Sequence, residues 1–470
     1  MSKPYDVLVI GGGVEGLVAV SLLARAGLRV QLLERSAILF GHAGGATLNA
    51  LDPRVVKDLK LARRGLRFAA RDLGLTVLRN GGANAVIGRD RHATARSLAA
   101  LSPADAAAYA GFRRELFALA HAMRPAWWDG ASAEDVVNRF KPQQRNLFER
   151  LAVTSATAWL GSCFESETLR AALAFAAVEC GVPPSEAGSA LALVWAAAQE
   201  MNGQQAAVAV PRGGVEGLLR ALALAAQKYG AEIRTAAPVV RLTLAQDAVA
   251  GVELANGETV AAPLVLSALS RKHTLLDLLP PAAIGFGAAR VLARPVATFG
   301  CATLVFTLIR ASSFDAGMRF VIAEKPETYD AALAAVRLGA TPRDLALELV
   351  ASPVELAQAP PAPLTLTVRA WPVASSYVRN DLVRTVGALI ERHAPGFMQI
   401  VNNCDVLEPQ DGDAFSMTRL LAGASQRIET SVPGLLLCGI DAEPVHAVSG
   451  RAARQAAGLA IALHKKARAR

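Results

Sequence analysis

The chain has 470 residues, and 53% of them are hydrophobic, so it is long enough to bury the cores of two domains. Its net charge is +9, yet aromatic residues make up only 5% and no nucleic-acid-binding motif is present, which argues against a nucleic-acid partner. Charged residues and a proline interrupt the longest apolar stretch, at 282–309, so we predict no transmembrane helix.

The first predicted element is a buried strand that leads into a glycine turn. Residues 5–10, YDVLVI, form a nearly continuous apolar run, as expected for a strand buried on both faces of a parallel sheet. Gly11, Gly13 and Gly16 follow with GxGxxG spacing, and a helix-periodic run then ends at Gly27. Because the strand begins almost at the N-terminus, it leaves no room for a signal peptide, and we expect a cytoplasmic protein.

A second strand, RVQLLE at 29–34, ends in Glu34 and completes the strand–turn–helix–strand–acid order of a dinucleotide site. The first glycine of such a site permits a tight turn, the second lets the backbone approach the pyrophosphate, and the third lets helix and strand pack closely. The N–H groups at the start of the helix face the phosphates. A carboxylate at position 34 accepts hydrogen bonds from ribose hydroxyls and disfavours a 2′-phosphate, so FAD or NAD fits better than NADP.

Residues 54–72 concentrate seven basic side chains against two acidic ones. Apolar residues are interleaved with these charges at helix-like spacing. One interpretation is a surface helix whose charges are simply solvated. The alternative is a basic amphipathic face in peripheral contact with anionic lipid.

Residues 91–204 predict mostly helices. Ser102 as N-cap and Pro103 at the first helical position mark the start of one of them, and 182–189 is a loop between two others. Four tryptophans lie in segments rich in alanine and leucine, which favours core packing over the alternative of a tunnel lining. They are Trp127, Trp128, Trp159 and Trp195.

A partial echo of the glycine stretch occurs later in the chain, because VAVPRGGVEG at 208–217 resembles VLVIGGGVEG at 7–16. Aligned without gaps, Arg212 replaces the first glycine, and Thr235 stands near the place of the ribose-binding acid. Both requirements of the fingerprint fail, so we reject a second dinucleotide site. We interpret PRGGVEGL as a glycine-rich start to a helix that crosses over to the next strand.

The segment 231–269 predicts a short strand followed by a small antiparallel meander. ANG at 255–257 is a hairpin signal between two alternating strands, and PLVLSAL at 263–269 is a buried strand that returns to the main sheet. A dinucleotide fold interrupted in this way is typical of flavoproteins. We therefore predict an α/β fold with a Rossmann-like domain.

The C-terminal segment predicts one more strand and a long helix. GLLLCGID at 434–441 is a buried strand that ends in glycine. The helix from VSGRAARQ onward has an N-terminus that can face a flavin and stabilise its reduced, anionic form. The five cysteines are scattered and the seven histidines show no metal-ligand spacing, so we predict neither a disulfide framework nor a metal.

These motifs, in this order, resemble the phytoene desaturase-like branch of the FAD-dependent amine oxidase superfamily. The resemblance covers essentially the whole chain and is carried by residues 7–35, 210–235, 265–274, 391–397 and 432–457. It implies a glutathione-reductase-type FAD-binding domain and a discontinuous α+β substrate-binding domain. The FAD-binding domain takes residues 1–90, 205–285 and 425–470, and the substrate-binding or capping domain takes 91–204 and 286–424.

The resemblance also implies which residues bind FAD. Gly11, Gly13, Gly16 and Glu34 would hold the ADP half together with Arg35, and the backbone at Val239 would lie against the adenine. Gly439 and Asp441 would contact the ribityl-pyrophosphate region, with the turn before Val448 under the flavin ring. The glycine pair that relatives carry soon after the ribose acid is displaced here to Gly44 and Gly45, preceded by His42.

The tail departs from the family pattern H-P-G-G-G-V-S-G. Val445, His446 and Ala447 replace three glycines that let the backbone lie against the flavin. His446 is our candidate catalytic residue, able to accept a proton as a carbon centre is oxidised; the alternative is a loop histidine that only fills space. Asp441 more naturally binds cofactor, and Glu443 fits either role or simple exposure.

The function implied by the resemblance is an FAD-dependent oxidoreductase that desaturates, oxidises or isomerises a hydrophobic small molecule such as a polyene or isoprenoid. One alternative is an FAD-dependent amine oxidase, which would release hydrogen peroxide with amines. The other is a catalytically altered flavin-binding scaffold that acts through protein contacts, its activity lost with the change at 445–447.

Overall fold

The N-terminal strand lies at the centre of a parallel sheet. The computed structural model describes residues 4–39, 46–79, 84–293, 299–351, 364–407, 417–445 and 447–469. Within them, β1 (Val7–Ile10) pairs with β2 (Val30–Leu33) on one side and with β13 (Val265–Ser267) on the other. The edge strands are β9 (Glu232–Arg234) and β19 (Leu435–Leu437), which gives the order β19-β13-β1-β2-β9.

Both faces of this sheet are covered, as the apolar N-terminal run predicts. Val7 and Val9 pack toward a cluster shared with the helices α1 (Val14–Arg25), α10 (Gly214–Lys228) and α16 (Arg451–Arg468). Leu8 and Ile10, which alternate with them, pack against the small antiparallel sheet. That sheet consists of β10 (Val239–Ala245), β11 (Ala248–Leu254) and β12 (Thr259–Ala261). The predicted meander, its turn at 255–257, the returning strand and the C-terminal helix are confirmed.

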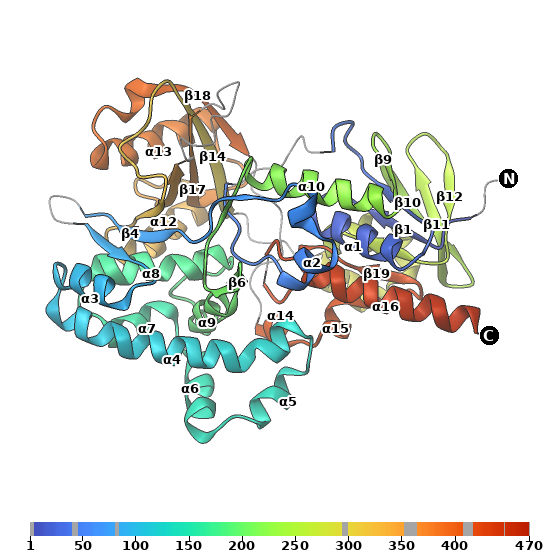
Figure 1. Cartoon of the computed structure of the whole chain (residues 1–470), viewed down its shortest axis with the longest axis horizontal. Coiled ribbons are helices and arrows are strands. Elements are labelled where there is room, and N and C mark those ends of the chain that lie inside the picture. The colour runs from blue at the N-terminus through green and yellow to red at the C-terminus, as the bar shows by residue number, and fades with distance from the viewer. Residues whose placement is uncertain are drawn as a thin grey trace.

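A second, mixed sheet forms the other end of the molecule (Figure 1). Its seven strands are antiparallel except where β15 runs parallel to β4. α13 (Arg379–His393) packs against one side of it, and the helices α8 (Glu167–Glu179) and α12 (Glu327–Arg337) pack against the other. In spatial order the strands are β18 (Val401–Leu407), β14 (Phe299–Leu308), β17 (Leu364–Ala374), β16 (Ala346–Ala351), β15 (Met318–Ile322), β4 (Gly74–Val77) and β5 (Ala85–Ile87).

The predicted helical region at 91–204 is confirmed. Ser102 Oγ accepts a hydrogen bond from the Asp105 N–H at 3.2 Å and caps the longest helix. All four tryptophans are buried, with at most 6% of their surface exposed, which confirms their assignment to the core. The helices are α3 (Arg91–Ala99), α4 (Pro103–Trp128), α5 (Ala133–Asn138), α6 (Pro142–Val153), α7 (Ala156–Cys163), α8 (Glu167–Glu179) and α9 (Ala190–Ala198).

Shorter elements connect these layers. Two-stranded pairs join β3 (Phe68–Ala70) to β8 (Val210–Pro211) and β6 (Glu200–Met201) to β7 (Gln204–Gln205). The remaining helical segments are α2 (Pro53–Asp58), η1 (Leu61–Arg64), η2 (His273–Asp277), η3 (Pro281–Ala283), α11 (Phe286–Leu292), α12 (Glu327–Arg337), η5 (Phe397–Ile400), α14 (Met417–Leu421), α15 (Ala424–Ile428) and η6 (Ile440–Ala442). The domain boundaries given above stay a proposal, in which β4 and β5 pair within the second sheet although they precede residue 90.

The echo at 208–217 starts a crossover helix, as predicted, because α10 runs from the glycines to the edge strand β9. Its resemblance to the first glycine stretch has a packing reason. A Cβ at Gly16 would lie 1.9 Å from the carbonyl oxygen of Gly11, and a Cβ at Gly217 would lie 2.0 Å from that of Arg212. Both helices start so close to the preceding turn that only glycine fits there.

The prediction of a single surface helix at 54–72 is wrong. α2 ends at Asp58, Lys60 adopts a left-handed conformation with φ of 53°, and the 3₁₀ helix η1 then ends at Gly65 with φ of 96°. The left-handed residues break the helical path, and the chain continues into the strand β3.

Candidate cofactor site

The glycine turn after β1 leaves backbone open at the start of α1. Gly11 has φ of 99°, a conformation that side chains rarely adopt. Gly13 is the N-cap of α1 and has no side-chain cap, and no atom lies within 4 Å of the place that a Cβ would take. The space beside the Gly13 backbone at the start of α1 is therefore clear, where a phosphate site is predicted.

Glu34 holds this turn from the end of β2. Its Oε2 accepts a hydrogen bond from the Gly12 N–H at 2.6 Å, and its Oε1 accepts one from the Ser36 N–H at 2.8 Å. The side chain is half-buried, while Arg35 is exposed. The acid thus lies beside the glycine turn, where the predicted ribose contact needs it.

The tail reaches the same edge of the sheet through η6. A Cβ at Gly439 would lie 2.5 Å from the carbonyl oxygen of Ala268, so the ends of β19 and β13 touch. Asp441 is buried and accepts a hydrogen bond from the Arg271 N–H at 2.7 Å. Val239, the first residue of β10, is half-buried. The carboxyl ends of the parallel strands therefore gather these residues, as in other open α/β sheets.

Two carboxyl groups occupy the N-terminus of α16. Glu15 Oε1 accepts hydrogen bonds from the N–H groups of Ser449 at 3.0 Å and Gly450 at 2.8 Å. Glu443 Oε1 accepts one from the Ala452 N–H at 2.8 Å and one from the Ser449 hydroxyl. We predicted that the N-terminus of this helix can face a flavin. The N–H groups of residues 449, 450 and 452 bind side chains of the protein, and Glu443 is buried rather than exposed.

The surroundings of Glu15 favour its protonated form. Burial, followed by repulsion from Glu443, raises its pKa to about 8, against the opposing effect of the two backbone N–H donors. Oε2 of Glu15 has no hydrogen-bond partner among the described residues. At neutral pH the group therefore mainly keeps a proton.

Arg451 connects this cluster to the helical region. The side chain is 2% exposed, and its NH2 group donates to Gln199 Oε1 at 2.6 Å. The guanidinium lies 4.8 Å from the ring centre of Trp128 and 3.7 Å from Glu443. Burial lowers the pKa of this arginine, although Glu443 opposes that effect. A buried cation thus joins α16 to the ends of α4 and α9.

The sequence reasoning missed the roles of Glu15, Arg451 and Gln199. One signal was present for Glu15, since it is a charged residue at the start of a largely apolar helix. Their partners lie far away in sequence, so spacing alone does not reveal the cluster.

Some predicted site residues lie outside the described part of the chain: His42, Gly44, Gly45 and His446. Beside the last of these, Val445 is fully buried in the core of the helical region, and Ala447 packs against the same core. Val448 is half-buried against the cofactor-side core. The tail therefore passes from one core to the other within a few residues.

Within the described ranges, no cluster of three or more histidine, cysteine or acidic side chains could hold a metal ion. In the same part of the chain, no helix combines the length and the apolar character needed to cross a membrane.

Relatives of known sequence match roughly half of the chain. Mouse pyridine nucleotide-disulfide oxidoreductase domain-containing protein 2 is 28% identical over 322 residues, which are 59% of this chain and 55% of that protein. The phytoene dehydrogenase of Streptomyces griseus is 30% identical over 284 residues, 53% of this chain and 51% of that protein. The chain thus spans about half the length of the curated relatives it matches.

Solved structures match over nearly the full length. An oxidoreductase from Methanosarcina mazei has a TM-score of 0.64 at 18% identity, covering 98% of this chain and 99% of that one. A triple mutant of putrescine oxidase has the same TM-score at 14% identity, with the same coverage. At these identities the likeness defines the fold.

The fold and the glycine turn define a protein with a Rossmann-like nucleotide-binding domain. The family described as flavin containing amine oxidoreductase matches residues 54–292, more than half of the chain, and a Rossmann-like NAD(P)-binding family matches residues 9–58. The chain belongs to the flavin-containing amine oxidoreductase family, and phytoene dehydrogenases and desaturases are among the relatives that match part of it. Its cofactor is FAD.

Proposed function

We propose that this chain is an FAD-dependent oxidoreductase that desaturates, oxidises or isomerises a hydrophobic small molecule, such as a polyene or isoprenoid. The observation that carries the proposal is the course of the tail, which leaves the cofactor sheet at Gly439 and enters the apolar helical core at Val445. A substrate held beside Val445 and Ala447 would meet the apolar side chains of that helical core. The match to phytoene dehydrogenase supports the same class of substrate.

The residues present fit FAD at the nucleotide end. In the proposed arrangement, Gly11, Gly13 and Gly16 admit the pyrophosphate at the start of α1, where the backbone is open. Glu34 accepts hydrogen bonds from the ribose, with Arg35 beside it, and the Val239 backbone borders the adenine.

The tail forms the other end of the proposed site. Gly439 and Asp441 face the ribityl-pyrophosphate region, and the turn before Val448 underlies the ring. When bound, FAD would supply a hydride acceptor for a substrate C–H bond, and the residues of this chain would position the reacting groups and exclude water from them. His446 remains our proposed proton acceptor.

Glu15 and Glu443 fix the backbone of the tail in this proposal. Their carboxyl groups accept hydrogen bonds from the backbone N–H groups of residues 449, 450 and 452. These hydrogen bonds fix the backbone that directly follows the turn at 447–448. Because Glu15 mainly keeps a proton at neutral pH, the cluster carries less negative charge than two carboxylates would. A smaller negative charge near this turn would oppose electron uptake by the flavin ring less.

An amine substrate is the second candidate, favoured by the family description. A polar amine is normally matched by polar or charged groups in its pocket. The tail residues on either side of position 446 instead pack into the apolar helical core, so we rank an amine below a hydrophobic substrate.

The test begins with the visible spectrum of the purified protein and the identity of the released cofactor. Anaerobic mixing with a detergent-solubilised polyene such as phytoene, and separately with putrescine or cyclohexylamine, then follows the loss of flavin absorbance. We expect the polyene to bleach the flavin and the amines to leave it oxidised. The apoprotein, from which the flavin has been removed, serves as the control without flavin.

Other outcomes decide among the alternatives. Bleaching by an amine, with peroxide released in air, would make the chain an amine oxidase. Bound flavin that neither class reduces would favour the scaffold.

A further inference from the structure

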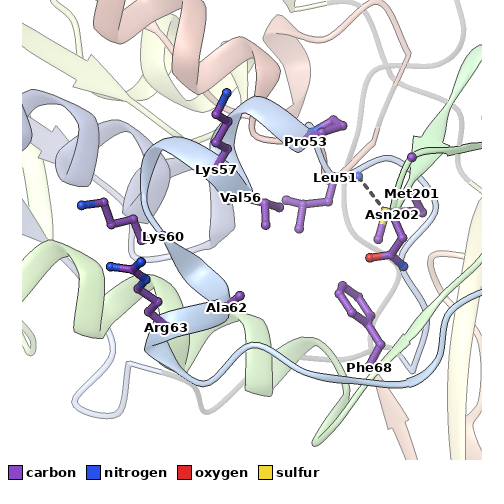
Figure 2. Close-up of a pocket in the computed structure, with 11 residues that line it drawn as sticks. Leu51, Pro53, Val56, Lys57, Lys60, Ala62, Arg63, Phe68, Met201 and Asn202 are labelled. Atoms are coloured by element: carbon purple, nitrogen blue, oxygen red, sulfur yellow. Dashed lines mark hydrogen bonds between the residues drawn. The ribbon is translucent and has the colours of Figure 1, made fainter.

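A cavity of about 420 Å³ lies beside α2 and η1, at the seam with the β6–β7 turn. Its volume lies within the range of small-molecule sites. Figure 2 shows its lining: Val56, Leu51 and Ala62 face the hollow, and Phe68 and Met201 lie across it. The Leu51 N–H contacts the Met201 sulfur at 3.2 Å and joins the two sides.

The hollow exists because this segment is not one helix. α2 stops at Asp58, and the left-handed Lys60 redirects the chain into η1. Val55 and Leu59 point inward and are fully buried, whereas Val56 stays half-exposed on the cavity side. Because of this bend, the apolar side chains surround a cavity and do not pack against a neighbouring element.

Three cations lie at the edge of this hollow, Lys57, Lys60 and Arg63, and their charged ends reach outward from it (Figure 2). All three are exposed, and none has an ion-pair partner in the described part of the chain. The acid of the same segment, Asp58, faces Arg25 at 3.4 Å and Arg454 at 3.7 Å instead. No acidic side chain lines the cavity.

We propose that this cavity binds a single-chain anionic amphiphile, with its acyl chain against the apolar lining and its carboxylate or phosphate head on the three cations. Charge and shape complement each other, because a chain buries apolar surface while the head meets unpartnered positive charge. The site stands apart from the oxidation proposed above, since it involves none of the residues assigned to FAD.

The three cations and the apolar lining exclude simpler occupants. A free anion would contact the cations but not Phe68 and Met201. A neutral lipid would contact these apolar side chains but not the cations. A flat membrane surface would contact the exposed cations without entering the hollow. The proposal therefore requires both parts of the site at once.

The experiment is calorimetric titration of the FAD-loaded protein with dodecanoate and with dodecyl phosphate below their micellar concentrations. Dodecyl trimethylammonium and inorganic phosphate are the comparison ligands. We expect saturable binding of both anionic amphiphiles, and binding at least tenfold weaker for the other two. Turnover is not measured, so failure of the proposed oxidation does not affect the result.

Variants test the two parts of the site separately. Replacing Lys57, Lys60 and Arg63 together by glutamine should weaken binding more than about tenfold. Ala62→Trp, at an exposed position that faces the hollow, should weaken it by filling the space. The matched control replaces the exposed Lys465, Lys466 and Arg468 at the end of α16 by glutamine, which removes the same charge and should change binding less than about twofold. Retained flavin absorbance shows that each variant is folded.

Several outcomes would overturn the proposal. One is no saturable binding of either amphiphile. A second is equal loss of binding in both triple variants, which would indicate net charge alone. A third is inorganic phosphate that binds as tightly as dodecyl phosphate. The fourth is flotation with anionic phosphatidylglycerol vesicles that depends on the three cations but is unchanged by Ala62→Trp, which would make the segment a membrane-contact surface.

Discussion

Oε1 of Glu15 lies 2.8 Å from the backbone nitrogen of Gly450, although the two residues are 435 positions apart. Glu15 belongs to α1, which starts at the glycine turn, and Gly450 is the N-cap of α16. One buried carboxyl group therefore fixes the two ends of the cofactor site to each other. Its protonation state matters for the stability of the whole cofactor side.

The Glu15→Gln variant should flatten the pH dependence of stability. The folded protein holds the Glu15 pKa near 8, above its ordinary value of 4.5, so it binds more protons than the unfolded chain between these values. The free energy of unfolding should therefore fall as pH rises through that window and level off above it. Glutamine does not titrate, so the variant should be about 4–5 kcal/mol more stable than the parent near pH 8.5 and within about 1 kcal/mol of it near pH 5.

Urea unfolding of the FAD-loaded proteins at these two pH values measures the effect. The control is Glu216→Gln, at the corresponding position of the echo, where the side chain is exposed and pairs with Arg220. It should leave the pH profile of the parent unchanged. Identical profiles for Glu15→Gln and the parent would contradict the burial argument.

Two glycines with the same steric constraint separate folding from cofactor binding. A methyl group at Gly16 or at Gly217 would collide with a backbone oxygen at 1.9 or 2.0 Å, so Gly16→Ala and Gly217→Ala should each destabilise the fold by about 1–3 kcal/mol. Only Gly16→Ala should also weaken FAD binding, because α10 begins away from the parallel sheet. Thermal unfolding and flavin titration measure the two effects, and equal loss of FAD in both would argue for a general effect of instability.

Gly13→Ala is the converse variant. Nothing lies within 4 Å of the added Cβ, and the backbone has φ of −70°, so stability should stay within about 0.5 kcal/mol of the parent. If the pyrophosphate approaches this residue as proposed, FAD affinity should fall about tenfold or more. Unchanged affinity would remove Gly13 from the proposed phosphate contact.

The parallel sheet, the meander and the C-terminal helix could be predicted because their signals are local. The run Val7–Ile10 is apolar at every position, and the turn at 255–257 uses a glycine with φ of 82°. The break at Lys60 could not be predicted, since a lysine gives no local sign that it will adopt φ of 53°. Tertiary packing of Val55 and Leu59 on one side of the bend overrides the helical periodicity.

In the candidate site, too, some residues could be predicted from local sequence signals and others could not. Glu34 and the glycine turn follow from a fixed spacing, whereas the cluster of Glu15, Glu443 and Arg451 depends on helices from both ends of the chain meeting at one point. No periodicity links such residues. Long-range contacts of this kind are therefore found from the structure.

Arg451→Met should destabilise the protein far more than Arg454→Met. Arg451 is buried against Glu443, Gln199 and Trp128, and removing it leaves a buried acid without its cation, at a loss of about 3–5 kcal/mol. Arg454 is about one-third exposed and lies 3.7 Å from Asp58, so its loss should amount to about 0–1 kcal/mol. Urea unfolding gives the comparison, and similar losses would mean that Arg451 is not the link between the two regions.

Glu34→Ala tests whether the glycine turn needs its acid. The variant removes the carboxylate that accepts from the Gly12 and Ser36 N–H groups at 2.6 and 2.8 Å, and hydrogen bonds to a charged group each contribute about 1.5–3 kcal/mol. The turn should lose its fixed shape and the ribose its proposed acceptor, so FAD affinity should fall more than about tenfold. The control is Glu232→Ala on the edge strand β9 of the same sheet, where the carboxylate is half-exposed and meets Arg29 at 3.8 Å; it should change FAD affinity less than about twofold. Fluorescence titration of the apoproteins with FAD measures both, and parental affinity in Glu34→Ala would show that the turn holds its shape without the acid and that the ribose is bound elsewhere.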